Sequence, residues 1–227
     1  MGVLDHLVPH LLSVQKPARY LGGEMNAVIK EPGNRLRFAL AFPDVYEIGM
    51  SYTGLPILYG LLNREDAIAA ERVFAPWPDM EALMRQTGTP LYTLETQTPV
   101  SRMDVLGFTL QYELTATNLL TMLELGGIPI RTEDREAGPL VMAGGPGATN
   151  PEPLAPFIDV FFVGEAERHL VPLLKAIHSY SQAGMDRGTL LSELDREYPF
   201  LYVPSRRNPR ANGIFMTVDG PPVRRTF

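Results

Sequence analysis

Glycines follow two short apolar runs in the second half of the chain. The first run, "LVMA", leads into "GGPGATNPEP", which places Gly144, Gly145 and Gly147 in one turn. The second run, "DVFFV", leads into Gly164 and Glu165 of "GEAE". Because glycine has no Cβ atom, such turns let the backbone approach a bulky ligand closely. The pattern indicates ligand binding, although the same turns would also suit a packed α/β domain that binds nothing.

Phosphate binding has more specific signatures than these turns, and the sequence lacks them. Neither G-x-G-x-x-G nor G-x-x-x-x-G-K-[ST] occurs. The segment "GGPGA" is too short, and Pro146 removes a backbone N–H group that a phosphate-binding loop would use. The sequence therefore disfavours a nucleotide-dependent dehydrogenase or a kinase.

Side chains that could transfer protons are few and scattered. Asp44 and Glu47 share one loop and Glu165 opens a helix, which defines a hydrolase or transferase hypothesis. Turn stabilisation and charge at a helix start explain the same carboxylates and are the favoured interpretation. His169 and His178 lie nine residues apart, unlike the i, i+4 spacing of a helical metal pair. No catalytic or metal-binding residue is therefore predicted.

Composition and charge narrow the class of protein. The formal net charge of −6 disfavours direct binding to nucleic acid. The absence of cysteine excludes disulfides, thiolate zinc sites and iron–sulfur ligation within these 227 residues. No apolar stretch approaches the roughly 18 residues that a membrane helix needs, and the N-terminus lacks a signal-peptide pattern. We therefore expect a cytoplasmic protein with no membrane partner.

Segments of strand and helix character alternate along the chain. Strands are predicted at 35–42, 71–77, within 90–100 (edge-like), 105–109, 140–143 and 159–163, and helices at 4–15, 54–63, 78–87, 113–125, 165–180 and within 186–205. This alternation predicts a Rossmann-like α/β fold with a doubly wound, mainly parallel sheet. We expect an N-terminal helical arm (1–34), the Rossmann-like domain (35–182) and a C-terminal extension (183–227), in which 214–218 is one strand of a final hairpin.

Ligands bind a parallel sheet beyond the carboxyl ends of its strands, where the strand order reverses. Four predicted loops belong to that edge, and all are rich in glycine, proline or small polar residues: 43–54, 109–113, 144–153 and 164–167. The sequence therefore predicts a cofactor- or partner-binding α/β module without a visible catalyst.

Several segments in order resemble the N-terminal region of a radical-SAM protein family, whose members carry a cobalamin-binding-like domain ahead of the radical-SAM barrel. They include "KPARYLGGEMNAV", "FPDVYEIGMSYTGLPILYGLLN", "ERVFAPWPDME", "DVLGFTLQYELTATNLLTMLELGGIP" and "GGPGATNPEPLAPFIDVFFVGEAE". The resemblance covers roughly residues 16–182. The last segment also looks like the general pattern of cobalamin-binding domains in radical-SAM enzymes.

The resemblance implies a corrinoid ligand, with the corrin ring against the carboxyl edge of the sheet and its nucleotide tail running into the fold. Gly144 and Gly145 would let the ring or tail approach the backbone, Thr109 would hydrogen-bond the tail, and residues 46–52 would lie beside the ring. The cofactor-binding candidates are Tyr46, Gly49, Ser51, Tyr52, Thr109, Gln111, Gly144, Gly145, Gly147, Gly164 and Glu165.

Two departures from the related patterns limit what these residues do alone. The loop "PDVYEIGMSYTG" lacks the histidine of the cobalt-ligating Asp-x-His-x-x-Gly motif, so any cobalamin would have no protein imidazole ligand. A radical-SAM cluster needs cysteine ligands, and this sequence has none. The resemblance therefore implies that the iron–sulfur cluster and S-adenosylmethionine belong to a barrel of the same polypeptide, toward which the C-terminal extension would lead. We therefore expect an auxiliary domain that is not catalytic alone. The alternative is an interaction or substrate-recognition module whose cofactor pocket is degenerate, with Tyr46 or Tyr52 filling the space.

Overall fold

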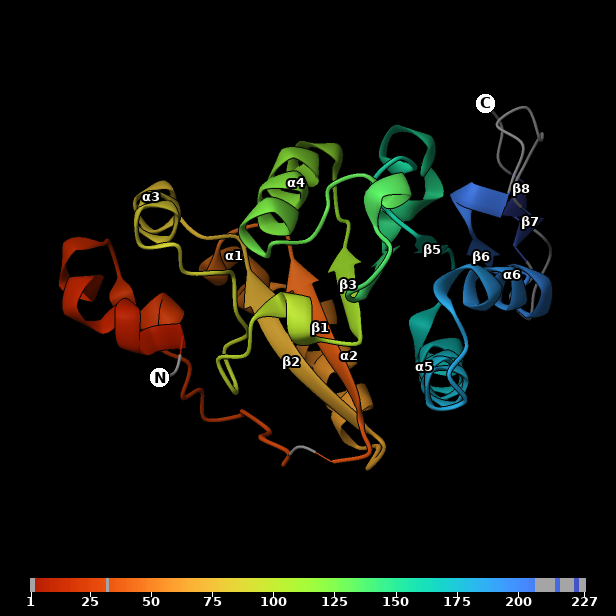
Figure 1. Ribbon diagram of the computed structural model, residues 1–227, viewed down its shortest axis with the longest axis horizontal. Helices are drawn as coiled ribbons and strands as arrows, with labels where there is room; N and C mark the ends of the chain where they lie inside the picture. Colours follow the sequence, from red (N-terminus) through yellow and green to blue (C-terminus); the bar gives the residue numbers. More distant parts are fainter. Residues whose placement is uncertain (1–2, 32, 207–214, 217–222, 225–227) are drawn as a thin grey trace.

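Six strands form one sheet in the order β2-β1-β3-β4-β5-β6 (Figure 1). The structure, a computed structural model, describes residues 3–31, 33–206, 215–216 and 223–224. The strands are β1 (Leu36–Phe42), β2 (Ile68–Phe74), β3 (Val105–Thr109), β4 (Leu140–Gly144), β5 (Val160–Phe162) and β6 (Leu201–Tyr202). The first five are parallel and β6 is antiparallel to β5. The predicted doubly wound, mainly parallel α/β fold is therefore confirmed.

Helices cover both faces of the sheet because successive strand residues point to opposite sides. One set of alternate strand residues packs against α2 (Gly54–Asn63), α5 (Ala166–Gln182) and α6 (Arg187–Glu197). The other set packs against α3 (Pro78–Thr87), α4 (Ala116–Leu125) and the 3-10 helices Val3–His6 and Val8–Ser13. The sheet is thus covered by helices on both sides.

Local residue chemistry explains several helix ends. Pro78 is the first residue of α3, and Gly88 ends that helix with a φ of 65°, the left-handed conformation that glycine adopts easily. Asp186 precedes α6 and accepts a hydrogen bond from the Thr189 backbone N–H at 3.0 Å. These proline, glycine and aspartate signals place α3 and α6 close to where the sequence predicts them.

Several predicted elements differ from the structure, and one is the predicted loop 43–54, which contains the helix α1 (Tyr46–Ser51). The helix predicted at 4–15 is replaced by the two N-terminal 3-10 helices, the second with Pro9 in its first turn, where proline lacks a donor for a continuous α-helix. The strand predicted within 90–100 is wrong, because only an isolated bridge joins Tyr92 to Pro99 there. The strand predicted at 71–77 spans Ile68–Phe74 instead, and Pro76 follows its end.

The C-terminal part of the described chain joins the same sheet. β6 pairs with β5, and α6 packs on the face that α2 and α5 cover. Farther along, β7 (Phe215–Met216) and β8 (Val223–Arg224) pair antiparallel, as the predicted hairpin requires, while 214, 217 and 218 lie outside the described residues. The division into arm, domain and extension stays a prediction.

Among the described residues, no helix combines the length and the hydropathy that crossing a bilayer requires.

Candidate functional site

The strand order reverses at β1, whose neighbours are β2 on one side and β3 on the other. The chain leaves β1 through α1 (Tyr46–Ser51) and α2 on one face, and it leaves β3 through α4 on the opposite face. The arrowheads of β1 and β3 point to the top of Figure 1, which is the carboxyl edge. Such a reversal opens a crevice at the carboxyl ends of the strands, where doubly wound proteins bind ligands.

A cleft of about 520 Å³ lies at this edge, between the sheet and helices α2 and α5. Ligand pockets of small-molecule sites commonly fall in this size range. Most of the strand residues that line it face the same side of the sheet, and they are mainly apolar: Phe38, Leu40, Gly107, Thr109, Met142 and Phe162. The helix residues that line it add Ile57, Leu58 and Leu170. The cleft is therefore an apolar slot that reaches inward from the strand ends.

Polar side chains gather at the mouth of this cleft. Four of them line it: Tyr52 after β1, Thr109 at the end of β3, Gln111 after β3 and Glu165 after β5. None of these four side chains hydrogen-bonds to another described residue. Thr109 is buried, Tyr52 and Gln111 are half-buried and Glu165 is exposed. Polar groups that are free to bond a ligand around an apolar slot are typical of a binding site.

Backbone geometry at the mouth depends on two adjacent glycines with different constraints. Gly145 has a φ of 94°, and a Cβ atom there would lie 2.7 Å from the carbonyl oxygen of Leu110. Only glycine fits that position. At Gly144 the nearest atoms to an added Cβ are those of Phe162 at 3.6 Å and beyond, which is ordinary contact. Gly145 therefore shapes the turn, whereas Gly144 leaves usable space in the cleft.

The structure brings seven of the eleven predicted residues to the cleft. They are Tyr52, Thr109, Gln111, Gly144, Gly145, Gly164 and Glu165. Sequence reasoning missed Gly107 and the apolar floor. A glycine in the middle of the predicted strand "VLGFT" is the signal that was available, since it often marks a close approach, and a Cβ atom at Gly107 would lie 2.3 Å from the Phe38 ring.

The other four predicted residues have structural surroundings. The Tyr46 hydroxyl donates to Glu24 at 2.5 Å. Gly49 is buried where α1 packs on Phe42 and Phe74, the exposed Ser51 donates to its own helix, and Gly147 packs on Leu110. Tyr46 begins α1 and Tyr52 directly follows it, and of these two tyrosines Tyr52 lines the cleft.

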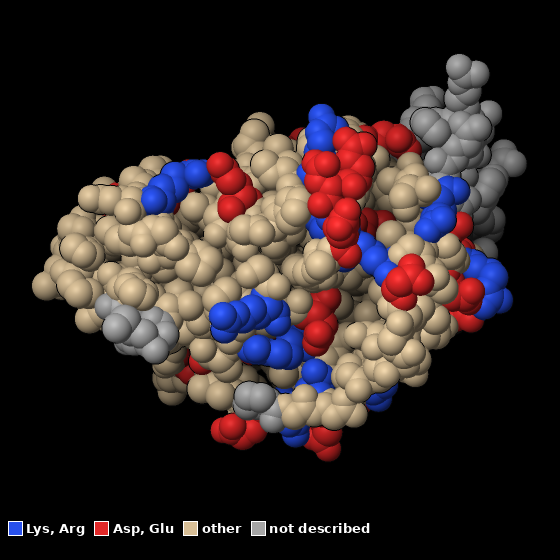
Figure 2. Space-filling view, viewed as in Figure 1, with Lys and Arg blue, Asp and Glu red and all other residues tan. Residues whose placement is uncertain are grey.

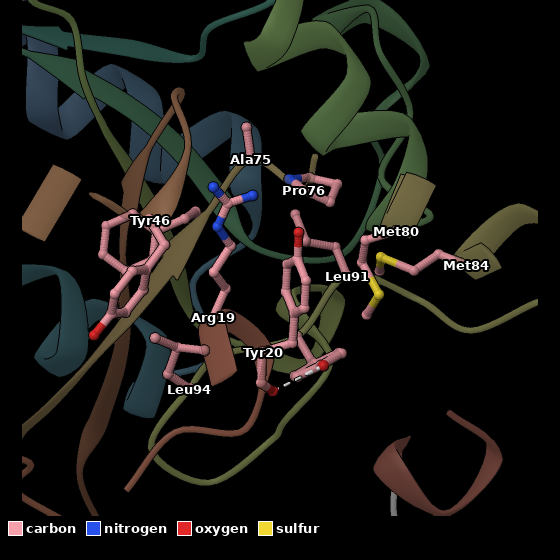
Figure 3. A pocket seen from close by; sticks show the side chains of 11 residues that line it. Arg19, Tyr20, Tyr46, Ala75, Pro76, Met80, Met84, Leu91 and Leu94 are labelled. Carbon is pink, nitrogen blue, oxygen red and sulfur yellow. Dashed lines mark hydrogen bonds between the residues drawn. The ribbon is translucent and has the colours of Figure 1, made fainter. Parts of the chain in front are cut away.

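Tyr46 instead lines a small cavity beneath the N-terminal arm (Figure 3). The guanidinium of Arg19 lies between Tyr46 and Tyr20, and Met80 and Met84 lie beyond Tyr20. The Tyr92 hydroxyl donates to the Tyr20 carbonyl oxygen at 3.0 Å. The cavity measures about 20 Å³, which is room for about one water molecule. It cannot hold a cofactor.

The carboxylates of the hydrolase hypothesis do not share a cavity. Glu47 is held by Lys16 and Arg19, and these hydrogen bonds lower its pKa to about 2. Asp44 accepts from the Val45 backbone N–H and from the Tyr112 hydroxyl. Only Glu165 lines the cleft. The arrangement therefore offers no acid–base pair for that chemistry.

The charged side chains that line the cleft are acidic. Among the described residues, no group of three or more histidine, cysteine or carboxylate side chains could hold a metal ion. The cleft lining includes Glu165 and Glu167 and no described lysine or arginine. On the face seen in Figure 2, basic side chains form small groups beside acidic ones instead of a continuous band.

The fold and cleft define a doubly wound α/β domain with a ligand-sized site at its topological switch point. Residues 54–204, about two thirds of the chain, match the family described as radical SAM proteins, N-terminal. The chain therefore belongs to this family. No curated protein and no solved structure matches it.

Proposed function

We propose that this chain is an auxiliary domain of a radical-SAM enzyme and that its cleft binds a cobalamin. The nucleotide tail would enter the cleft between the sheet and helices α2 and α5, and the corrin ring would lie outside, on the carboxyl edge. The observation that carries the proposal is the apolar slot at the β1–β3 reversal, with unused polar groups at its mouth.

The charge of the cleft supports a corrinoid over a phosphate-rich nucleotide. A flavin mononucleotide or dinucleotide would bring two or more negative charges to a mouth that holds Glu165 and Glu167 and no described cation. A cobalamin carries one phosphodiester, and the positive charge of its cobalt centre offsets it. Electrostatic repulsion at the mouth is therefore much smaller for the corrinoid.

The chain's own residues suggest how the cofactor would be held. The Thr109 hydroxyl and the Gln111 amide would donate to the tail, and the backbone of Gly144 and Gly145 would approach it closely. No histidine lines the cleft, so the cobalt would have no imidazole ligand from it. Bound there, the cofactor would present an organometallic centre to a radical-SAM domain in the same polypeptide, which would hold the iron–sulfur cluster and S-adenosylmethionine.

An absorbance titration with hydroxocobalamin tests this proposal. Gly144→Leu should fill the cleft, because a Cβ at Gly144 is sterically free and the residue lines the site. Gly60→Leu is the matched control, since an added Cβ on that residue of α2 meets nothing within 4 Å. Saturable spectral change should occur with wild type and Gly60→Leu and should be at least about tenfold weaker with Gly144→Leu. No saturable change with wild type would contradict the proposal, as would equal affinity in all three proteins.

A second function, docking of the radical-SAM domain, is favoured by apolar side chains exposed at the same edge. Ile48, Trp77, Tyr112 and Leu114 follow β1, β2 and β3, and Leu114 is 84% exposed. Exposed apolar groups at one site favour protein contact. In the full-length protein, amide hydrogen exchange of 110–116 should be slower than in the 227-residue chain. Leu114→Asp should abolish this difference. The control is Leu12→Asp, at a residue of the N-terminal arm that is 93% exposed, and it should leave the difference unchanged. Identical exchange in both forms would contradict docking.

A further inference from the structure

We infer that the cleft selects corrinoids by their lower base, accepting an apolar base such as 5,6-dimethylbenzimidazole and rejecting adenine. The inference rests on the proposed corrinoid function and adds which part of the ligand the cleft recognises. It is based on how side chains are distributed in the cleft: polar side chains lie at the mouth, and apolar side chains lie deeper.

The inner part of the cleft has side chains with almost no hydrogen-bonding capacity. Phe38, Leu40, Met142 and Phe162 line it and are 2–5% exposed. Leu58 and Leu170 close it from the helix side. Apart from the weakly accepting sulfur of Met142, these side chains offer neither a donor nor an acceptor.

Strand geometry places the polar groups farther out. Thr109 is the last residue of β3, and Gly107 is the next residue inward on the same face, about 6.6 Å deeper at about 3.3 Å per strand residue. A hydroxyl therefore stands at the mouth, while the position beneath it has no side chain. The other polar lining residues follow strand ends in the same way.

The backbone N–H and C=O groups at this depth also have hydrogen-bond partners in neighbouring strands. Gly107 is paired with Met142 between β3 and β4, and Leu40 is paired with Gly107 between β1 and β3. The N–H and C=O groups of parallel neighbours form the ladder hydrogen bonds. A ligand base between the sheet and α2 would thus find no free backbone donor or acceptor at the level of Gly107.

The two kinds of lower base differ in what they require from such surroundings. Adenine carries an exocyclic amine and ring nitrogens that are solvated in water, and burying them without partners is unfavourable. The dimethylated benzene ring of dimethylbenzimidazole has no such groups and gains from apolar burial. One unpaired polar group is enough to weaken binding about tenfold or more.

Three corrinoids distinguish this inference from the function on which it rests. We expect the wild-type chain to bind hydroxocobalamin at least about tenfold more tightly than its adenine-base analogue, and more tightly than cobinamide, which lacks the base. Equal affinity for the two base-carrying corrinoids would overturn the inference, as would cobinamide binding as tightly as hydroxocobalamin. Both results would leave corrinoid binding intact, whereas failure of all three corrinoids to bind would overturn the proposed function itself.

A polar substitution in the cleft wall provides an independent test. Leu58→Gln introduces an amide on a half-buried position of α2 that lines the cleft, and it should reduce the hydroxocobalamin-to-adenine preference several-fold. The matched control is Leu120→Gln on α4, a half-buried leucine on the opposite face of the sheet. This control should keep the wild-type ratio. An unchanged ratio in a folded Leu58→Gln protein would overturn contact between the base and this wall.

Discussion

The cleft and the small cavity beneath the N-terminal arm both lie near the carboxyl side of the sheet, yet their polar groups are used differently. In the cavity, Arg19 bonds Glu47, the Tyr46 hydroxyl bonds Glu24, and the Tyr20 hydroxyl accepts from the Trp77 backbone. In the cleft, the polar side chains at the mouth have no described partner, and the volume is about 520 Å³ instead of about 20 Å³. The cavity is thus closed by contacts within the chain, although Arg19 Nη1 has no described partner, whereas the polar groups at the cleft mouth remain available to a ligand.

The largest effect should come from a buried ion pair that lines neither the cleft nor the small cavity. Arg72 of β2 and Glu95 form an ion pair at 2.7 Å whose side chains are 2% and 0% exposed. Glu95→Ala would leave a buried guanidinium without its carboxylate, so we expect a loss of about 3–5 kcal/mol in the free energy of unfolding. Urea denaturation measures the change.

The control for that measurement is an exposed ion pair. Glu124→Ala removes one of the two carboxylates that pair with Arg85 on the surface and should change the free energy of unfolding far less than Glu95→Ala does. Equal losses in the two variants would contradict a structural role of the buried pair. Per folded molecule, Glu95→Ala should still bind hydroxocobalamin with wild-type affinity, because Glu95 does not line the cleft.

A smaller effect should separate the two glycines at the cleft mouth. Gly145→Ala forces a side chain onto a φ of 94° and ψ of −177° and toward the Leu110 carbonyl, which should cost about 1–3 kcal/mol of stability. Gly144→Ala should change stability by no more than about 0.5 kcal/mol, as an unhindered substitution does. Thermal unfolding of the two variants makes the comparison, and similar stabilities would show that the turn is not constrained as described.

The smallest effect concerns acid stability at the arm. Lys16 and Arg19 lower the pKa of Glu47 to about 2, below the value of about 4.3 for an unfolded glutamate. Between these values the unfolded state binds more protons, so the contribution of Glu47 is present above about pH 4.3 and is lost as the pH falls toward 2. Because the Glu47 side chain is 40% exposed, solvent screening keeps this contribution small.

Glu47→Gln checks the sign of that effect. Urea denaturation from pH 6 to pH 2 should show a shallower fall in stability for the variant than for wild type. The control is Glu133→Gln, whose carboxylate is 75% exposed and lies 3.9 Å from Arg131. A wild-type pH profile in Glu47→Gln would contradict a stabilising arm contact.

The fold was predictable because its signals are local. Alternating apolar runs, Pro78, Gly88 and Asp186 mark elements without reference to the rest of the chain. The segment 90–100 misled the prediction because "LYTLET" has strand composition, while Gln97 at a φ of 55° turns the chain back after a single bridge. Composition reports side-chain preference and not whether a neighbouring strand is there to pair with.

The site was predictable at its mouth and not in its depth. Turn residues after strands must gather at one edge of a parallel sheet, which brings Gly144, Gly164 and Thr109 together. The floor depends on strand register, such as the pairing of Gly107 with Met142, and the separation of Tyr46 from Tyr52 depends on how α1 packs. Those facts arise from tertiary packing, which one sequence does not specify by local pattern.

The most direct test of the corrinoid site is methyl NMR of the chain labelled at its methionines, with and without hydroxocobalamin. Met142 lines the cleft, whereas Met80 and Met84 line the small cavity, and Met→Leu variants assign the three signals. The corrinoid should shift the Met142 methyl signal saturably and leave those of Met80 and Met84 unchanged. An unchanged Met142 signal at saturating hydroxocobalamin, or shifts confined to Met80 and Met84, would contradict the assignment of the cleft as the corrinoid site.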